Sequence, residues 1–343
     1  MRFRFLRSLF TAAPSQAGKY DKSLILRAIE RVADGTDPRL RAVSHYRRKL
    51  WNAVEHAIDC VVTLVNTLPP ASELNSRTYM TDPRLRALFA SPDHLREVLS
   101  FSHGTRLYLK QASKPLPAEL YAALGATRIE KTVLGMELEG ELLRRDVPQT
   151  VVNFCDHRLV FLADHEQDTR RELMRRGFDY LIEVALEQLV STRVQRHQLE
   201  QQQRQLLQKK ASLLKTAKPG LEALLEVDTS EPTDVDTIEQ QLQEVEAELD
   251  QLRADSTTLE QHLEQVAATL STAENYLRLE SVSFTLDHMN IKVPPDSPRV
   301  ANTLTFDELV LGQDRRLTAL FIRFPSHELL PQPDFFKEAH RLL

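Results

Sequence analysis

Residues 235–277 read VDTIEQQLQEVEAELDQLRADSTTLEQHLEQVAATLSTAENYL, and apolar residues recur in them at alternating spacings of three and four. Within this register, Ser256 is the position that is not apolar. A seven-residue apolar repeat keeps one seam facing a partner helix and winds the helices into a left-handed supercoil. The stretch therefore predicts one arm of a coiled coil. Its seam runs through Val235, Ile238, Leu242, Val245, Leu249, Leu252, Ser256, Leu259, Leu263, Val266, Leu270, Ala273 and Leu277.

A second helical stretch, residues 165–218, supplies the partner within the same chain. Its seam is poorer, because leucines alternate there with polar and charged residues. Charge favours the pairing: residues 193–218 hold seven Lys or Arg and one acid, whereas residues 234–264 hold ten acids and one base. Opposite charges along facing flanks select a partner more than they add stability. The seam positions of this stretch are Arg196, Leu199, Gln203, Leu206, Lys210 and Leu213.

The segment between the two stretches predicts a turn. Pro219-Gly220 is expected to end the first arm, 165–218, because proline clashes inside a helix and glycine tolerates a C-terminal cap. Thr233 begins the second arm, 233–277, with Asp236 completing an acidic variant of a capping box. We expect an antiparallel hairpin roughly 60–70 Å long at ~1.5 Å per residue. The alternative is a parallel homodimer through the acidic arm, in which the acids beside the seam would repel one another.

Composition narrows the function classes. The chain has 343 residues, enough for two or three domains, and its formal net charge of -5 argues against general nucleic-acid binding, which usually requires a basic domain. Two cysteines, Cys60 and Cys155, indicate reduced thiols rather than a disulfide framework. No apolar run approaches the ~18 residues of a membrane span. We therefore expect a cytoplasmic protein.

Residues 1–19 form a basic segment that is amphipathic if helical. One interpretation is a membrane-surface anchor, which would place the protein at the inner face of a membrane. The interpretation that we favour is a segment that docks on the protein or has no fixed structure, because three bases on barely three turns bind lipid weakly. Arg7 interrupts the apolar part, so no cleaved secretion signal is expected. The apolar face holds Phe3, Leu6 and Phe10, and the bases are Arg2, Arg4 and Arg7.

Residues 20–125 predict an α-helical domain. Its longest helix covers about 38–68, where Pro38 suits the first helical position and apolar residues recur at helical spacing. Pro69-Pro70 ends this helix. Shorter helices are expected over 21–33, 82–90, 91–101 and 117–124.

Residues 126–163 and 278–343 predict a small antiparallel β domain. Isolated hairpins are marginal in water, so the two halves should join in one sheet, with the strands that end near Ala163 and begin near Leu279 as neighbours. The expected strands are 128–139, 150–163 with a two-residue turn at Asp156-His157, 281–286, 289–293 and 317–324, and a helix follows over 333–343.

These elements predict an α+β fold. An N-terminal helical domain precedes a small antiparallel β domain, which is interrupted by the inserted coiled-coil hairpin over residues 164–277.

Motifs for chemistry are weak. The nine glycines form neither a G-x-x-x-x-G-K nor a G-x-G-x-x-G run, so we expect no nucleotide cofactor. Cys155, Asp156 and His157 match no established zinc spacing, and no metal site is predicted. Glu137, Glu139 and Glu141 alternate on an expected strand, where a solvent-facing strand edge explains them as well as acid–base chemistry does.

Two further surfaces suggest binding. Arg47, Arg48 and Lys49 lie in a basic patch that could follow a phosphate backbone, although solvated bases on a helix are commonplace. At the expected hairpin tip, an apolar cluster suits a protein partner; it consists of Leu221, Leu224 and Leu225.

The favoured function is a non-catalytic coiled-coil scaffold or adaptor that binds another protein through its helical hairpin. Three alternatives stay open: a peripheral membrane protein anchored by its N-terminal segment, a metal-dependent or hydrolytic enzyme, and a nucleic-acid-associated accessory protein. A homo-oligomer is compatible with the favoured scaffold function. The sequence does not identify the partner.

Overall fold

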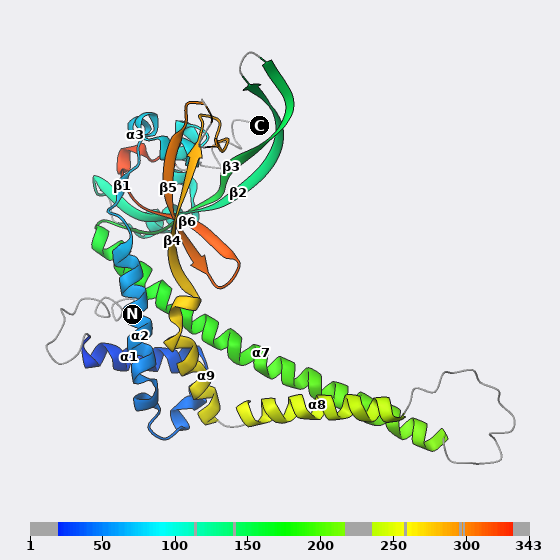
Figure 1. Cartoon of the computed structure of the whole chain (residues 1–343). Coiled ribbons are helices and arrows are strands. Elements are labelled where there is room, and N and C mark those ends of the chain that lie inside the picture. Colours follow the sequence, from blue (N-terminus) through cyan, green and yellow to red (C-terminus); the bar gives the residue numbers. More distant parts are fainter. Residues whose placement is uncertain are drawn as a thin grey trace, which may run out of the picture. The chain divides into compact units, whose positions relative to one another are not determined.

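The computed structural model describes residues 20–112, 115–139, 142–216, 235–256, 259–294, 297 and 299–331 (Figure 1). The fold is α+β, as predicted. Two compact units divide the chain differently from the expected domains. The first, here called the hairpin unit, comprises Met1–Ala57 and Tyr180–Thr272, and the second, the sheet unit, comprises Ile58–Asp179 and Ala273–Leu343.

The hairpin unit is built from helices. The first helix begins where the Asp21 side chain accepts a hydrogen bond from the Ser23 backbone N–H, and its buried residues recur at helical spacing from Leu24 to Ala33. The remaining elements include long helices that also contribute residues to the sheet unit. The elements are α1 (Lys22–Gly35), η1 (Pro38–Ala42), part of α2 (Tyr46–Thr67), part of α7 (Glu166–Thr216), α8 (Val235–Ser256) and α9 (Leu259–Ser271).

The helices α7 and α8 pair in an antiparallel register. Gln203 Nε2 donates to Glu246 Oε1 at 3.1 Å, and Lys210 Nζ lies 2.6 Å from Glu239 Oε1. Seven residues forward on α7 therefore correspond to seven residues backward on α8, which is one heptad. This confirms the predicted pairing of the basic and acidic helices. Beside these polar pairs, the seam buries Leu199, Ile238, Leu242 and Leu249.

The bounds of the second arm differ from the prediction. The helix α8 ends at Ser256, the polar position in the heptad register, and α9 begins at Leu259. The helix α9 ends at Ser271, so Leu277 was wrongly assigned to the coiled coil; it is the first residue of β4 (Leu277–Leu286). The predicted turn at Pro219-Gly220 lies outside the described residues.

One antiparallel sheet organises the sheet unit. Its strand order is β3-β2-β6-β5-β4, and the short β1 (Ser72–Glu73) pairs parallel with β6. The strand β2 pairs with β6 from Glu119↔Pro325 to Ala126↔Thr318, so stretches before and after the hairpin join in one sheet, as expected. The strands are β2 (Glu119–Glu139), β3 (Leu142–Ala163), β4, β5 (Asn302–Leu311) and β6 (Arg315–Pro325).

The expected neighbourhood of the strands ending near Ala163 and beginning near Leu279 is wrong. The strands β3 and β4 lie at opposite ends of the strand order. A short return after β4 bridges them instead: the Val152 N–H donates to the Asn290 carbonyl at 2.9 Å, and the Lys292 N–H donates to the Thr150 carbonyl at 2.8 Å. These bonds connect the two ends of the strand order and curl the sheet around its inner face.

Two local predictions are also wrong. Residues 119–124, expected in a helix over 117–124, lie in β2, where alternate residues from Leu120 to Ala126 are buried. Asp156 and His157 do not form a turn, because β3 continues through them. Asp156 has φ 53° beside a register shift in the β2–β3 pairing, so the expected turn is a β-bulge.

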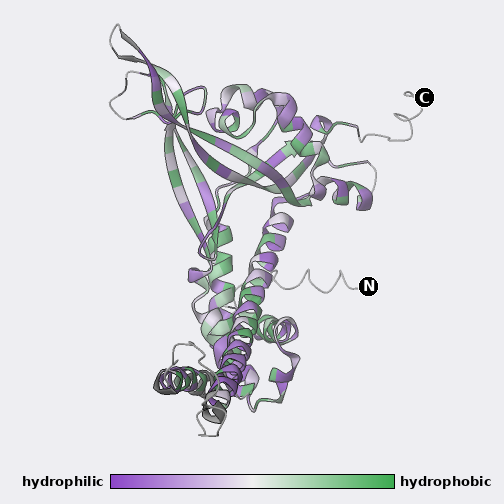
Figure 2. Cartoon of the chain, turned by 90° about the vertical axis from the view of Figure 1, so that its right-hand side faces the viewer, coloured by the Kyte–Doolittle hydropathy of each residue, from purple (hydrophilic) through white to green (hydrophobic). Residues whose placement is uncertain are grey.

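The inner face of the sheet packs on four short helices. These helices begin at side-chain caps: Asn75 forms a capping box with Thr78, and Ser91 accepts from the His94 N–H. Hydrophobic and hydrophilic residues alternate along the strands (Figure 2), which turns one face towards this core. The helices are α3 (Ser76–Thr81), α4 (Pro83–Leu88), α5 (Pro92–Phe101) and α6 (His103–Gln111), and fully buried core residues include Leu74, Leu85, Phe89, Leu95, Leu99, Leu120, Ile322 and Phe324.

Arg170 of α7 holds the C-terminal end of α2 inside the sheet unit. Its guanidinium donates to the carbonyls of Val65 at 2.7 Å and of Pro69 at 3.1 Å, and it lies 4.7 Å from the ring centroid of Phe321. The last carbonyls of a helix have no intrahelical donor, so this side chain satisfies groups that burial would otherwise leave unpaired.

Replacing Arg170 with Ala should destabilise the sheet unit, because several carbonyls lose a charged donor. We expect the free energy of unfolding to fall by about 2–4 kcal/mol in urea titrations. Arg176→Ala, which removes an exposed pair with Glu172, is the control and should cost less than about 1 kcal/mol. Equal losses in the two variants would contradict this role of Arg170.

Candidate protein-binding surface

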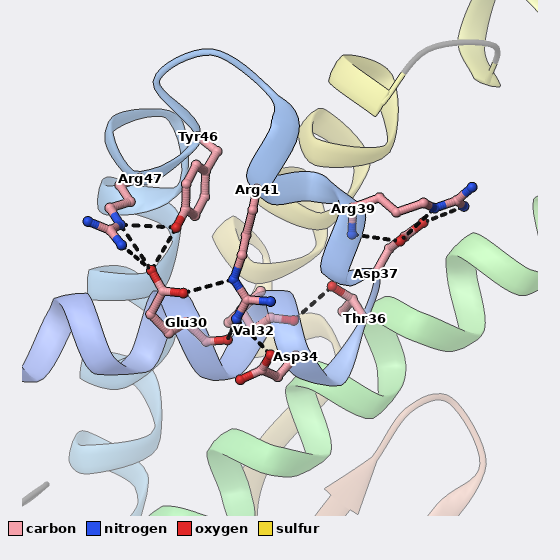
Figure 3. Close-up of polar contacts among 9 residues, drawn as sticks. All are labelled: Glu30, Val32, Asp34, Thr36, Asp37, Arg39, Arg41, Tyr46 and Arg47. Carbon is pink, nitrogen blue, oxygen red and sulfur yellow. Dashed lines mark hydrogen bonds and ion pairs between the residues drawn. The ribbon is translucent and has the colours of Figure 1, made fainter.

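The basic patch of the sequence lies in a carboxylate network of the hairpin unit (Figure 3). Glu30 accepts hydrogen bonds from Tyr46 Oη at 2.7 Å, Arg47 Nε at 2.9 Å and Arg41 Nε at 3.0 Å. These donors, Tyr46 first, lower the pKa of Glu30 below its usual value. The guanidinium of Arg47 is thus already paired with a carboxylate.

The other two candidate phosphate-binding residues differ from each other. Lys49 Nζ lies 3.0 Å from Glu260 Oε1 of α9, whereas Arg48 is exposed. Neutralising a phosphate backbone requires several bases that are free to release counterions. The structure ties two of the three predicted bases to acids of the same unit.

Asp37 is a buried carboxylate in the same unit. It receives Arg39 Nη2 at 2.8 Å and Arg193 Nη2 at 3.1 Å, and its side chain also caps η1 through the Arg39 N–H. The hydrogen bonds from Arg39 are the largest cause that holds the pKa of Asp37 far below its usual value. Asp37 therefore links η1 to α7 as an ionised group, and the sequence offered no pattern that would pair it with Arg193.

The Asp156-His157 pair is placed on β3 beside the short helices. His157 Nε2 lies 2.8 Å from the Leu88 carbonyl, and its ring stacks on Phe89 with centroids 4.9 Å apart. Burial, the largest cause, lowers the pKa of His157. Within the described residues, no group of three His, Cys, Asp or Glu side chains is arranged to hold a metal ion.

The two cysteines are free thiols at separate positions. Cys155 Sγ lies 3.6 Å from the Thr127 carbonyl, across the β2–β3 pairing. Burial raises the pKa of the Cys60 thiol to about 11. A raised thiol pKa lowers the population of the reactive thiolate at neutral pH.

A ladder of opposite charges crosses the sheet, and the sequence analysis missed it. Glu308 of β5 is buried, and its Oε1 lies 2.5 Å from Arg128 Nε, while Arg316 lies 3.6 Å from Oε2. Residues two positions apart on a strand share a face. The opposite charges of Arg128 and Glu130 were therefore the sequence signal that could have indicated this ladder. The ladder therefore gives the buried Glu308 two basic partners and joins charges of neighbouring strands. It runs Lys292, Glu130, Arg128, Glu308, Arg316, Glu280 and Arg278.

The strands β2 and β3 extend beyond the rest of the sheet as a two-stranded ribbon (Figure 1). Pairing of β2 with β6 stops at Ala126↔Thr318, whereas pairing with β3 continues to Glu139↔Leu142. We name the segments Thr132–Glu139 and Leu142–Thr150 the ribbon arm. From Thr150 back to Leu142, β3 pairs only with β2, and the facing part of β2 pairs only with β3, among the described residues.

The ribbon arm carries exposed apolar side chains. Leu134 is 70% exposed, Met136 59% and Val133 43%. Leu134 and Met136 are two residues apart on β2, so they project from the same face. Apolar side chains gathered in this way mark interaction surfaces more often than scattered ones do. Sequence reasoning placed these residues in the expected strand 128–139 and did not single them out.

Polar contacts support the ribbon arm near its bulge. Gln149 Nε2 and Arg299 Nη2 both donate to the Met136 carbonyl, at 3.1 and 3.2 Å. Asp146 takes a positive φ of 60° where the register shifts. Pro148, opposite Leu134, has no N–H and so limits strand addition at the outer edge of β3.

Several predicted site residues fall outside the description. Leu221, Leu224 and Leu225 of the expected hairpin tip, and Phe3, Leu6 and Phe10 of the N-terminal segment, lie outside the described residues, as does the helix expected over 333–343. Glu137 and Glu139 lie in β2, but their side chains are not described, and Glu141 lies outside the described residues.

Across the helices that the structure describes, none combines the length and apolar character needed to span a bilayer. Comparisons with protein-family models, with curated proteins and with solved structures find no match to this chain.

The half-buried His157 makes stability depend on pH. Its lowered pKa means that the unfolded chain binds a proton more readily than the folded one, so stability is lost as pH falls below the ordinary histidine value of about 6.5. We expect the free energy of unfolding to decrease between about pH 7.5 and 5.5, and His157→Gln to make this decrease shallower. The exposed His103→Gln is the control, and an unchanged slope in His157→Gln would contradict the prediction.

Proposed function

We propose that the protein is a non-catalytic scaffold or adaptor that binds another protein, and that the ribbon arm is one of its docking surfaces. The observation that carries this proposal is the exposure of Leu134, Met136 and Val133 on a ribbon that the sheet itself leaves uncovered. An isolated two-stranded ribbon is marginally stable in water, so a partner surface would both cover these residues and hold the strands.

The coiled-coil hairpin is the second arm of the proposed scaffold. Its cross-helix pairs, Gln203 with Glu246 and Lys210 with Glu239, repeat with the heptad and give α7 and α8 one register. A helical hairpin of fixed register is suited to present contact residues at its tip. We propose Leu221, Leu224 and Leu225 as the contact residues there, as the sequence suggested.

The engaged basic residues favour a protein partner over nucleic acid. Arg47 and Lys49 are paired with Glu30 and Glu260, and a phosphate backbone would have to replace both carboxylates. The apolar ribbon arm, in contrast, needs no exchange of partners before it can be buried. The proposal therefore places the partner, which can be a second copy of this chain, on the ribbon arm first.

A paired charge substitution on the ribbon arm tests the proposal. Full-length protein would capture partners from a lysate of its native host, and a partner bound in stoichiometric amount would then be purified and titrated. We expect Leu134→Glu with Met136→Glu to weaken the complex at least about tenfold, which corresponds to about 1.4 kcal/mol, because two charges would be buried in an apolar contact.

The control for this experiment is Met289→Glu, which changes an exposed methionine of the same unit outside the ribbon arm. It should bind as the unmodified chain does. Light scattering of the free protein identifies the case in which the partner is a second copy. Equal affinities of all three proteins, or the lack of any stoichiometric partner, would contradict the proposed role of the ribbon arm.

A further inference from the structure

The helix α7 carries an apolar stripe on its exposed face. Leu186, Val190 and Val194 are 37%, 46% and 51% exposed, and their spacing of four residues places them on one side of the helix. The opposite side of the same stretch packs inward, with Leu181, Ala185 and Leu189 buried. An open groove runs along the stripe, lined by Leu186, Glu187, Val190, Ser191, Val194, Gln195 and Gln198.

Two acids beside the stripe lack ion-pair partners. Glu183 and Glu187 are exposed on the stripe's side of α7, and neither has a basic partner among the described residues. Other acids of the hairpin unit, such as Glu30, Asp37 and Glu260, are paired. The stripe therefore combines an apolar centre with uncompensated negative charge, and its complement is an amphipathic segment that carries basic residues.

The small size of the stripe favours a tethered occupant over a free one. A stable complex between separate proteins buries about 1,200–2,000 Å², far more than three side chains provide. A segment of the same chain is held at an effective concentration in the millimolar range, so a small contact is sufficient.

We infer that residues 1–13 dock as a helix in this groove. Their apolar residues Phe3, Leu6 and Phe10 span seven residues, about 11 Å of helix at ~1.5 Å per residue, and the stripe from Leu186 to Val194 spans about 12 Å. Only residues 14–21 separate the segment from Lys22, where α1 of the hairpin unit begins.

Complementary charge is the reason for choosing residues 1–13 as the segment that occupies the groove. Residues 1–13 contain the bases Arg2, Arg4 and Arg7 and no acid, which matches the unpaired Glu183 and Glu187. Docking would cover the same phenylalanines that a membrane anchor would insert into lipid. The two uses of the segment are therefore mutually exclusive in one molecule.

Tryptic cleavage of the full chain tests the docking. Cleavage after Arg4 and Arg7, followed by mass spectrometry, reports how often the segment leaves the groove. Val190→Gln with Val194→Gln removes two apolar side chains from the centre of the groove without adding charge and without changing a buried residue. We expect this variant to be cleaved about tenfold faster, which corresponds to about 1.4 kcal/mol of lost docking.

The matched control is Leu207→Gln, at a 48%-exposed position on the same helix outside the groove. It should be cleaved at the rate of the unmodified chain, and circular dichroism should show equal helix content in all three proteins. Equal cleavage rates in all three would overturn the docking.

A vesicle assay separates docking from membrane anchoring. Docking predicts that the unmodified chain pellets poorly with anionic phosphatidylglycerol vesicles and that the Val190→Gln with Val194→Gln variant pellets better, because its segment is released. Strong and equal pelleting of both proteins would assign the segment to lipid and would also overturn the docking.

Discussion

The antiparallel seam between α7 and α8 is the contact on which the rest of the structure depends. The strands β2 and β3 precede this hairpin and β4, β5 and β6 follow it, yet β2 pairs with β6 over eight residue pairs. That pairing requires the chain to return after more than a hundred residues. Two helices that pack antiparallel return the chain close to where it left. The free-energy cost of closing this long loop between the strands is therefore small.

Polar residues in the seam set its register. A seam made only of leucines tolerates shifts by a heptad, whereas Gln203 with Glu246 and Lys210 with Glu239 satisfy each other in one alignment. Such pairs add little stability at an exposed surface, so the energy comes from buried residues such as Leu249. The stretch of α7 around Leu186 and Val190 retains an exposed apolar side, and the ribbon arm does the same on the sheet. This exposure is the reason that we propose both surfaces as binding surfaces.

The parts of the fold with strong periodicity could be predicted from the sequence. The heptads and the charge asymmetry predicted the hairpin, and alternation predicted β4 and β6. Residues 119–124 were assigned to a helix closed by Gly125, but pairing with β6 overrides local helix propensity and buries Leu120 and Ala122. Asp156 and His157 were expected to form a turn, whereas the structure uses the positive φ of Asp156 in a bulge. Exposure of Leu134 and Met136 depends on where the pairing of β2 with β6 stops, at Ala126↔Thr318, which no local pattern encodes.

Disulfide trapping tests the central seam most directly. With Cys60 and Cys155 replaced by Ser, Gln203→Cys and Glu246→Cys would place two thiols across α7 and α8. We predict that mild oxidation of a dilute sample yields a cross-linked species with the mass of one chain, while Gln203→Cys combined with Glu260→Cys does not cross-link. A cross-linked species with the mass of two chains, or no cross-link in the first variant, would contradict the hairpin and the topology that follows from it.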